Sequence, residues 1–120
     1  MSVIVSKTSY LKISDGDSSV TLEQKTETIT PTGTKKISNS QSIGLTWEAI
    51  DFGDLGTLGE VGLENTDATN YVELALDNAG AQKFAKLRAG MRAIIPFSTK
   101  TVYSQANIGA CVVNIIAAEE

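Results

Sequence analysis

The stretch GEVGLENTDATNYVELALDNAGAQKFAKLRAGMRAIIPF, residues Gly59 to Phe97, carries the strongest fold signal in the chain. Within it Val72, Leu74 and Leu76 fall on one side of the backbone, which is the period of a half-buried strand. Turn-forming residues over 65–70 precede this strand, because short Asn and Asp side chains bond to nearby backbone amides. The stretch therefore predicts a β-meander in which segment 60–64 reverses directly into segment 70–77.

The rest of the chain also favours strands, since Thr, Ser, Val and Ile dominate, only 2 prolines occur and no segment sustains an amphipathic helix. Segment 78–88 fits either one helical turn or a strand ending at Arg88, and we prefer the strand. The predicted strands are Ser9–Ser14, Ser18–Thr30, Gly33–Ser38, Ser42–Ile50, Glu60–Glu64, Asn70–Asp77, Met91–Phe97, Thr101–Ser104 and Ala110–Ala117. The fold class is thus all-β, with an antiparallel β-sandwich as the expected architecture.

The predicted core follows from the alternation within these strands. It comprises Leu45, Trp47, Val61, Leu63, Val72, Leu74, Leu76, Leu87, Ile95, Val113 and Ile115. A chain of 120 residues with 42% hydrophobic residues is expected to form a single domain, residues 1–120, that buries about two-thirds of its unfolded surface.

The two ends of the chain differ in apolar content. Between Thr21 and Ser42 the only aliphatic side chains are Leu22, Ile29 and Ile37, so residues 1–42 are expected to form an extended arm or an exposed ribbon. The C-terminal strand is apolar on both sides, which indicates that its second face is covered by a loop or by another subunit. A homo-oligomer is the resulting expectation.

Cysteine and hydropathy place the chain in a broad class. Cys111 is the only cysteine, and its apolar neighbours in the sequence predict that its side chain is buried. A single cysteine cannot form a disulfide within the chain, so we expect synthesis in a reducing compartment. The apolar run Val3-Ile4-Val5 is too short for a signal sequence or a membrane span. We therefore expect no membrane partner.

The charge balance excludes one further class of partner. The net charge is −4 and the pI about 4.8, and the basic residues are scattered, so no phosphate-binding footprint is present and nucleic acid is not expected to bind directly. One local basic group, Lys83, Lys86, Arg88 and Arg92, is typical of a solvated face, with an acidic protein partner as the alternative.

Glycine recurs at every third position in one segment, at Gly53, Gly56, Gly59 and Gly62. So few triplets without proline do not make collagen. The spacing also matches neither of the common phosphate-binding glycine loops. We interpret the run as a tight crossing between two sheets with Leu55 and Leu58 pointing inward.

Catalysis and metal binding have little support. The chain has no histidine, which removes the usual nucleophilic triads and His-ligated metal sites. Carboxylates could supply a glycosidase pair, but nothing in their spacing requires one; they are Glu48, Asp51, Asp54, Glu60, Glu64 and Glu73. Segment 65–70 resembles a calcium loop in composition but lacks the EF-hand glycine and glutamate, so turn capping explains it better. No catalytic, cofactor-binding or metal residue is assigned.

Aromatic residues leave one binding alternative open. Trp47, Tyr71 and Tyr103 could form a platform on which a sugar ring stacks, although aromatics this far apart in sequence are more often core or sheet-face residues. A carbohydrate-binding module would place Trp47 or Tyr71 on an open concave face.

Several ordered segments carry a resemblance to a protein family. They are Ile43-Gly44-x-Thr46-Trp47-Glu48-Ala49-Ile50, Gly53-Asp54-Leu55-Gly56-Thr57, Glu64-Asn65-Thr66-Asp67-Ala68-Thr69-Asn70-Tyr71-Val72-Glu73-Leu74, and Lys86-Leu87-Arg88-Ala89-Gly90 leading to Ile94-Ile95-Pro96. In this order the segments resemble small β-sandwich virion structural proteins of tailed bacteriophages, over the part of the chain that follows Gly33.

The resemblance implies a β-sandwich, with a jelly-roll-like arrangement as one form of it, that assembles on the phage particle. It further implies a bacteriophage structural protein, most simply a capsid decoration or cement subunit that acts by protein–protein binding. A neck or tail component and the carbohydrate-binding module are the alternatives. The implied partners are further copies of the chain, with a trimer as the expected assembly, and the phage major capsid protein or another virion protein. The implied location is the virion, after synthesis in the host cytoplasm.

Overall fold

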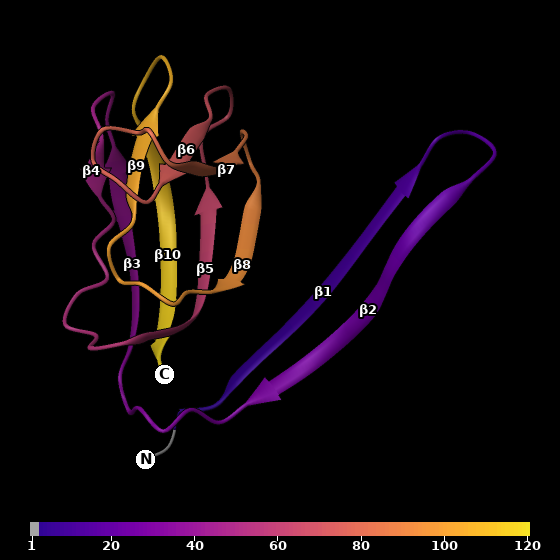
Figure 1. Ribbon diagram of the computed structural model, residues 1–120, viewed down its shortest axis with the longest axis horizontal. Helices are drawn as coiled ribbons and strands as arrows, with labels where there is room; N and C mark the ends of the chain where they lie inside the picture. The colour runs from indigo at the N-terminus through magenta and orange to yellow at the C-terminus, as the bar shows by residue number, and fades with distance from the viewer. Residues whose placement is uncertain (1–2) are drawn as a thin grey trace.

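Eight strands form two antiparallel four-stranded sheets that face each other in the computed structural model, which describes residues 3–120 (Figure 1). The first sheet has the order β3 (Lys36–Ile43), β10 (Cys111–Glu119), β5 (Leu58–Asn65) and β8 (Arg92–Pro96). The second has the order β4 (Glu48–Ala49), β9 (Tyr103–Ala106), β6 (Val72–Ala75) and β7 (Lys83–Leu87). The predicted all-β sandwich is confirmed, and this interleaved strand order is that of a jelly roll.

Two further strands stand apart from the sandwich. Strands β1 (Val5–Ser14) and β2 (Ser19–Ile29) pair only with each other among the described residues and form a long hairpin, here called the arm. Figure 1 shows the arm leaving the base of the sandwich on the β8 side and diverging from it toward a free tip. Residues 3–120 contain no helix, and so none with the length and apolar character needed to cross a membrane.

The core lies between the two sheets and is built from the inward side of each strand. On β10 the residues Cys111, Val113 and Ile115 are buried while Val112 and Ile116 point outward, as strand alternation requires. The crossing that leads from β4 to β5 adds Phe52 and Leu55 to the core, and Leu58 at the start of β5 is buried beside them. The interpretation of the glycine run as an inter-sheet crossing is confirmed for Gly53 and Gly56, and Leu55 and Leu58 point inward as expected. It is wrong for Gly59 and Gly62, which lie within strand β5.

The predicted meander over Gly59–Phe97 is wrong. Strand β5 pairs with β10 and β8 rather than with β6, and β6 pairs with β7 and β9 in the other sheet. Segment 66–71 thus carries the chain from one sheet to the other, and segment 88–91 carries it back. Turn residues signal a change of direction, but they do not say whether the next strand pairs with the previous one.

Four predicted core residues are not buried. Leu45 and Leu76 are exposed because they lie just beyond the ends of β3 and β6. A register shift between Leu74 and Ala75 buries both of these residues, which places the next residue, Leu76, on the solvent side. Ile95 faces inward opposite Val61 but remains 38% exposed, since β8 is an edge strand. Trp47 is half-buried at the surface.

The expected ribbon over residues 1–42 corresponds to the arm only along β1 and β2. Strand β3 runs continuously through the predicted break between segments 33–38 and 42–50, and it pairs with β10 over eight positions. Its Ile43 is buried and its Ile37 packs against the core. The expected boundary at residue 42 is therefore wrong, because a strand with few aliphatic side chains still completes a sheet through backbone hydrogen bonds.

Candidate functional site

The distal half of the arm presents an apolar face that the rest of the described chain does not cover. Leu11 pairs directly with Leu22 and Ile13 with Val20, so the four side chains lie on one side of the hairpin in two adjacent rungs. They are between 56% and 67% exposed. Because the four aliphatic side chains are neighbours, they form one continuous apolar patch, unlike the single exposed apolar residues that are common on protein surfaces.

The rungs that alternate with these two carry polar side chains on the opposite side of the hairpin. There Lys12 pairs with Thr21 and Ser14 with Ser19. The hairpin is closed by a tight turn in which Gly16 has φ of 84° and Ser18 Oγ donates to Asp15 Oδ1 at 2.6 Å. The arm is thus an amphipathic two-stranded ribbon.

The base of the arm is held against the sandwich. Lys7 Nζ donates to Glu60 Oε2 at 2.8 Å, and the two side chains are only 17% and 16% exposed. The hydrogen bond to Glu60 raises the pKa of Lys7 above its ordinary value, although partial desolvation opposes this. Val5 and Ile29 also line a hollow at the base, together with Phe97. These contacts fix where the arm starts and leave its tip free.

The outer face of the β3-β10-β5-β8 sheet carries a second partly apolar surface, here called the outer face. A hollow of about 560 Å³ lies on it. Ile116 and Ile94 stand on either side of Gly62 in one row across the sheet, and they are 58% and 51% exposed. A Cβ atom at Gly62 would lie 3.0 Å from Ile116 Cγ1, so glycine keeps the floor of the hollow low between the two isoleucines.

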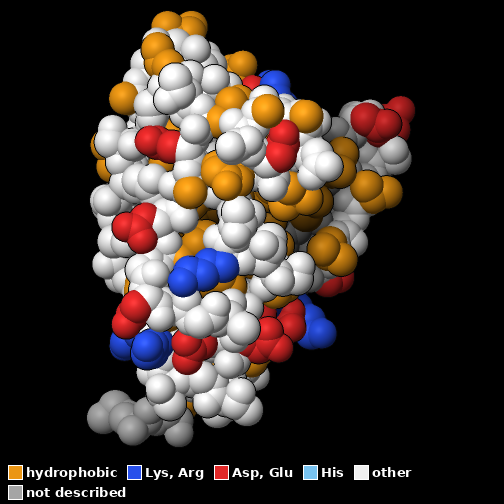
Figure 2. All heavy atoms as spheres, turned by 60° about the vertical axis from the view of Figure 1, so that its left-hand side comes forward, with side chains coloured by type: hydrophobic (Ala, Val, Ile, Leu, Met, Phe, Trp, Pro, Cys, Tyr) orange, Lys and Arg blue, Asp and Glu red, His pale blue; other side chains and the backbone are white. Residues whose placement is uncertain are grey.

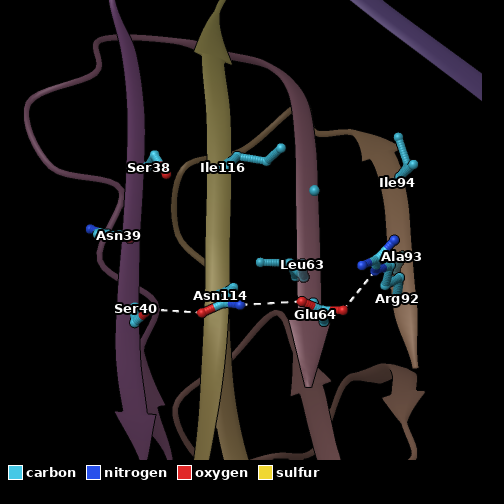
Figure 3. Close-up of a pocket in the computed structure, with 11 residues that line it drawn as sticks. Ser38, Asn39, Ser40, Leu63, Glu64, Arg92, Ala93, Ile94, Asn114 and Ile116 are labelled. Atoms are coloured by element: carbon cyan, nitrogen blue, oxygen red, sulfur yellow. Dashed lines mark hydrogen bonds and ion pairs between the residues drawn. The ribbon is translucent and has the colours of Figure 1, made fainter. Parts of the chain in front are cut away.

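A polar row borders this hollow (Figure 3). Ser40 Oγ donates to Asn114 Oδ1 at 2.7 Å, and Asn114 Nδ2 donates to Glu64 Oε1 at 3.2 Å. Arg92 Nε donates to Glu64 Oε2 at 2.6 Å. The bond from Arg92, and then that from Asn114, lowers the pKa of Glu64. The row therefore presents an ion pair and two amide or hydroxyl groups beside an apolar band.

The six carboxylates considered for catalysis bind separate partners. Glu60, Glu64 and Glu73 are paired with Lys7, Arg92 and Lys83 respectively. Asp54 lies 3.4 Å from Lys35 Nζ. Glu48 and Asp51 accept hydrogen bonds from the backbone amides of Gly44 and Gly53. The geometry does not single out a facing pair among them.

Segment 65–70 is a turn held together by its own side chains. Asp67 Oδ2 accepts from the amides of Thr69 and Asn70, at 3.0 and 2.7 Å, and these bonds, Asn70 first, lower the pKa of Asp67. Asn65 is fully buried, and its Nδ2 donates to the carbonyls of Asn70 and Leu87. Within residues 3–120 no group of three or more Cys, Asp or Glu side chains is placed to hold a metal ion.

The aromatic and basic residues do not gather on one surface. The Trp47 ring lies against the backbone at Gly80, and the Nζ atom of Lys86 lies 4.4 Å from the centroid of the Tyr71 ring. Trp47 and Tyr71 are both half-buried, so the geometry does not present the open ring faces that sugar stacking needs. Acidic and basic side chains are interspersed on the face shown in Figure 2, and Arg92 lies in a different sheet from Lys83.

Cys111 is buried, as predicted, and burial raises the pKa of its thiol. Its Sγ atom lies 3.6 Å from the carbonyl oxygen of Gly109. The side chain thus belongs to the core of the sandwich.

The sequence signals the two apolar faces unequally. The two-sided apolar pattern of the last strand points to an uncovered outer face, whereas the alternation of Leu11 and Ile13 with polar residues supplies only half of a patch. Its other half, Val20 and Leu22, is brought into register only by the hairpin.

Comparisons of the chain with protein-family models, curated proteins and solved structures found no match.

Proposed function

We propose that the chain is a structural protein of a tailed-bacteriophage virion, a capsid decoration or cement subunit that acts by protein–protein binding through its arm. The observation that carries the proposal is the arm itself. Its strands contribute no residue to the buried core, yet they place four exposed aliphatic side chains on one face. Exposed apolar surface of this size is unfavourable in water, and the free energy falls when another surface covers it.

The fold and the sequence add support of a weaker kind. Jelly-roll sandwiches are common in viral capsid proteins, but they also occur in lectins and enzymes, so the fold supports the proposal by analogy alone. The resemblance of segments 43–50, 53–57 and 64–74 to phage virion proteins is independent of the arm.

The direct test is binding to particles of the phage that encodes the chain. Particles lacking the protein are mixed with purified wild-type chain and sedimented, and we expect the chain to sediment with them. In the arm variant, Ile13→Glu with Val20→Lys, an opposite-charge pair replaces one apolar rung and preserves the cross-strand attraction. We expect this variant to stay in the supernatant.

The matched control is Ser14→Glu with Ser19→Lys, which places the same charges on the next rung but on the polar side of the arm. It should bind as the wild type does. Equal binding of the arm variant and the wild type would contradict a docking role for the arm. Sedimentation with isolated tails but not with heads would move the protein to the neck or tail.

A further inference from the structure

We infer that the apolar face of the arm binds the outer face of a second copy of this chain, with the Ile13–Val20 rung seated in the hollow between Ile116 and Ile94. The inference deepens the proposed function and rests on it only in taking the arm as a docking element. It names the receiving surface, which the proposed function leaves open.

The first argument is the match between the two surfaces. The arm offers two apolar rungs, Leu11–Leu22 and Ile13–Val20. The outer face offers an apolar row with a low centre at Gly62, bordered by the row that contains Glu64. The two apolar rungs of the arm are two strand residues apart, about 6.8 Å, which is also the spacing between successive rows of the outer face. The Leu11–Leu22 rung can therefore lie over a neighbouring row while the Ile13–Val20 rung lies on the row that contains Gly62.

The second argument explains why the occupant comes from another copy. The Lys7–Glu60 ion pair joins the base of the arm to the sandwich, beside the hollow that Val5 and Ile29 line. From there the arm diverges from the sandwich (Figure 1), and the isoleucines of the outer face remain more than half exposed. In this position the aliphatic side chains of the arm and the isoleucines of the outer face of the same chain leave one another uncovered.

The third argument concerns area. A half-exposed aliphatic side chain offers on the order of 70 Å², so four of them and the matching face bury roughly 600 Å² in one arm contact. Stable interfaces bury about 1,200–2,000 Å². A copy that gives its arm to one neighbour and receives an arm from another, or exchanges arms with a single partner, doubles the buried area and reaches that range. Such arm-to-face contacts are satisfied in full only in closed assemblies.

The experiment combines two variants that each lack one half of the contact. The arm variant is Ile13→Glu with Val20→Lys, and the face variant is Ile116→Glu with Ile94→Lys. Light scattering over a range of micromolar concentrations should show an oligomer for the wild-type chain and a monomer for each variant alone. Mixed together, the two should form a heterodimer only at higher concentrations than the wild-type oligomer needs, because the arm of the face variant can bind the intact face of the arm variant while the reciprocal contact is lost.

Two controls separate a lost contact from lost folding. Ile108→Glu replaces an isoleucine that is 76% exposed in the loop between β9 and β10, and it should leave the oligomer intact. Far-UV circular dichroism spectra should match the wild type for every variant. If the double face variant does not fold, the single Ile94→Lys substitution on the edge strand β8 takes its place.

Several results would overturn the inference. They are a monomeric wild-type chain throughout the concentration range, a face variant that assembles as the wild type does, and a mixture that yields no heterodimer. If the arm variant nevertheless fails to bind phage particles, the proposed function stands and the arm docks on another virion protein. If self-assembly follows the predicted pattern while the wild-type chain ignores the particles, the inference stands and the proposed function fails.

Discussion

The arm and the C-terminal strand β10 are both long antiparallel elements with apolar side chains at alternate positions, yet they stand in opposite environments. Strand β10 lies between β3 and β5, so both of its backbone edges are paired and one of its faces is buried. Each strand of the arm has one unpaired edge, and its apolar face meets solvent. The same alternation therefore builds a buried core in one region and leaves an uncovered apolar face in the other.

The largest expected effect comes from cutting the chain on either side of β3. A chain that begins at Gly33 lacks the arm but keeps the whole sandwich, and we expect its urea unfolding midpoint to stay close to that of the full chain. A chain that begins at Gly44 also loses β3, including the buried Ile43 and the pairing to β10, and should not fold. Circular dichroism and urea titration measure both. A folded second chain would contradict the placement of β3 in the sandwich.

The next largest effect is expected from a substitution in the core, compared with one at a nearby exposed position. Leu74 is 1% exposed between the sheets, so Leu74→Ala should lower the free energy of unfolding by about 2–5 kcal/mol. Leu76, two residues along the same strand pattern, is 48% exposed, and Leu76→Ala should cost well under half as much. Equal costs in urea titrations would contradict the register shift at Ala75.

The buried amide of Asn65 should have an intermediate effect. Asn65→Ala removes the donors to the carbonyls of Asn70 and Leu87, and it leaves these carbonyls without those partners at the crossing between sheets. A loss of about 1–3 kcal/mol in the free energy of unfolding is expected. Asn114→Ala, on the outer face, removes exposed hydrogen bonds and should cost less. A larger loss in the free energy of unfolding for Asn114→Ala than for Asn65→Ala would contradict the stabilising role of the buried Asn65 amide at the crossing.

A smaller effect is expected from acid. The pKa of Asp67 is lowered in the folded chain, so its contribution to stability is present above the unfolded pKa of about 4 and is lost as pH falls through the folded value. Asp67→Asn should therefore flatten the fall in unfolding midpoint between about pH 5 and pH 2. Urea titrations at several pH values measure this. An unchanged pH profile would contradict the role of the carboxylate in the turn.

Calcium is expected to have no effect. The carboxylate of Asp67 already accepts backbone amides, and thermal melts with and without excess calcium should superimpose. A site occupied at 100 times its dissociation constant would add about 2.7 kcal/mol, which a melt readily detects. A calcium-dependent rise in the melting temperature would reopen segment 65–70 as a metal loop.

Local sequence patterns were sufficient for most of the strands, for the turns and for the buried side of β10. Each depends on residues close in the chain: alternation selects an extended backbone, Asn and Asp cap their own turns, and Leu55 and Leu58 point inward from a glycine-rich crossing. The candidate site was predictable only in part. The outer face followed from the pattern of β10, but the hollow at Gly62 did not, because it needs Ile94 from another strand.

The sequence by itself determined the class of the fold, because the period-two alternation of its strands is a local property that any strand pairing must respect. Only the tertiary structure decided which strands become neighbours. Strand β5 meets β10 and β8 instead of β6, β3 joins the sandwich despite its polar composition, and Val20 and Leu22 come to face Leu11 and Ile13. The physical reason is that alternation fixes the side on which a residue lies, whereas pairing depends on backbone hydrogen bonds and packing between segments distant in the chain.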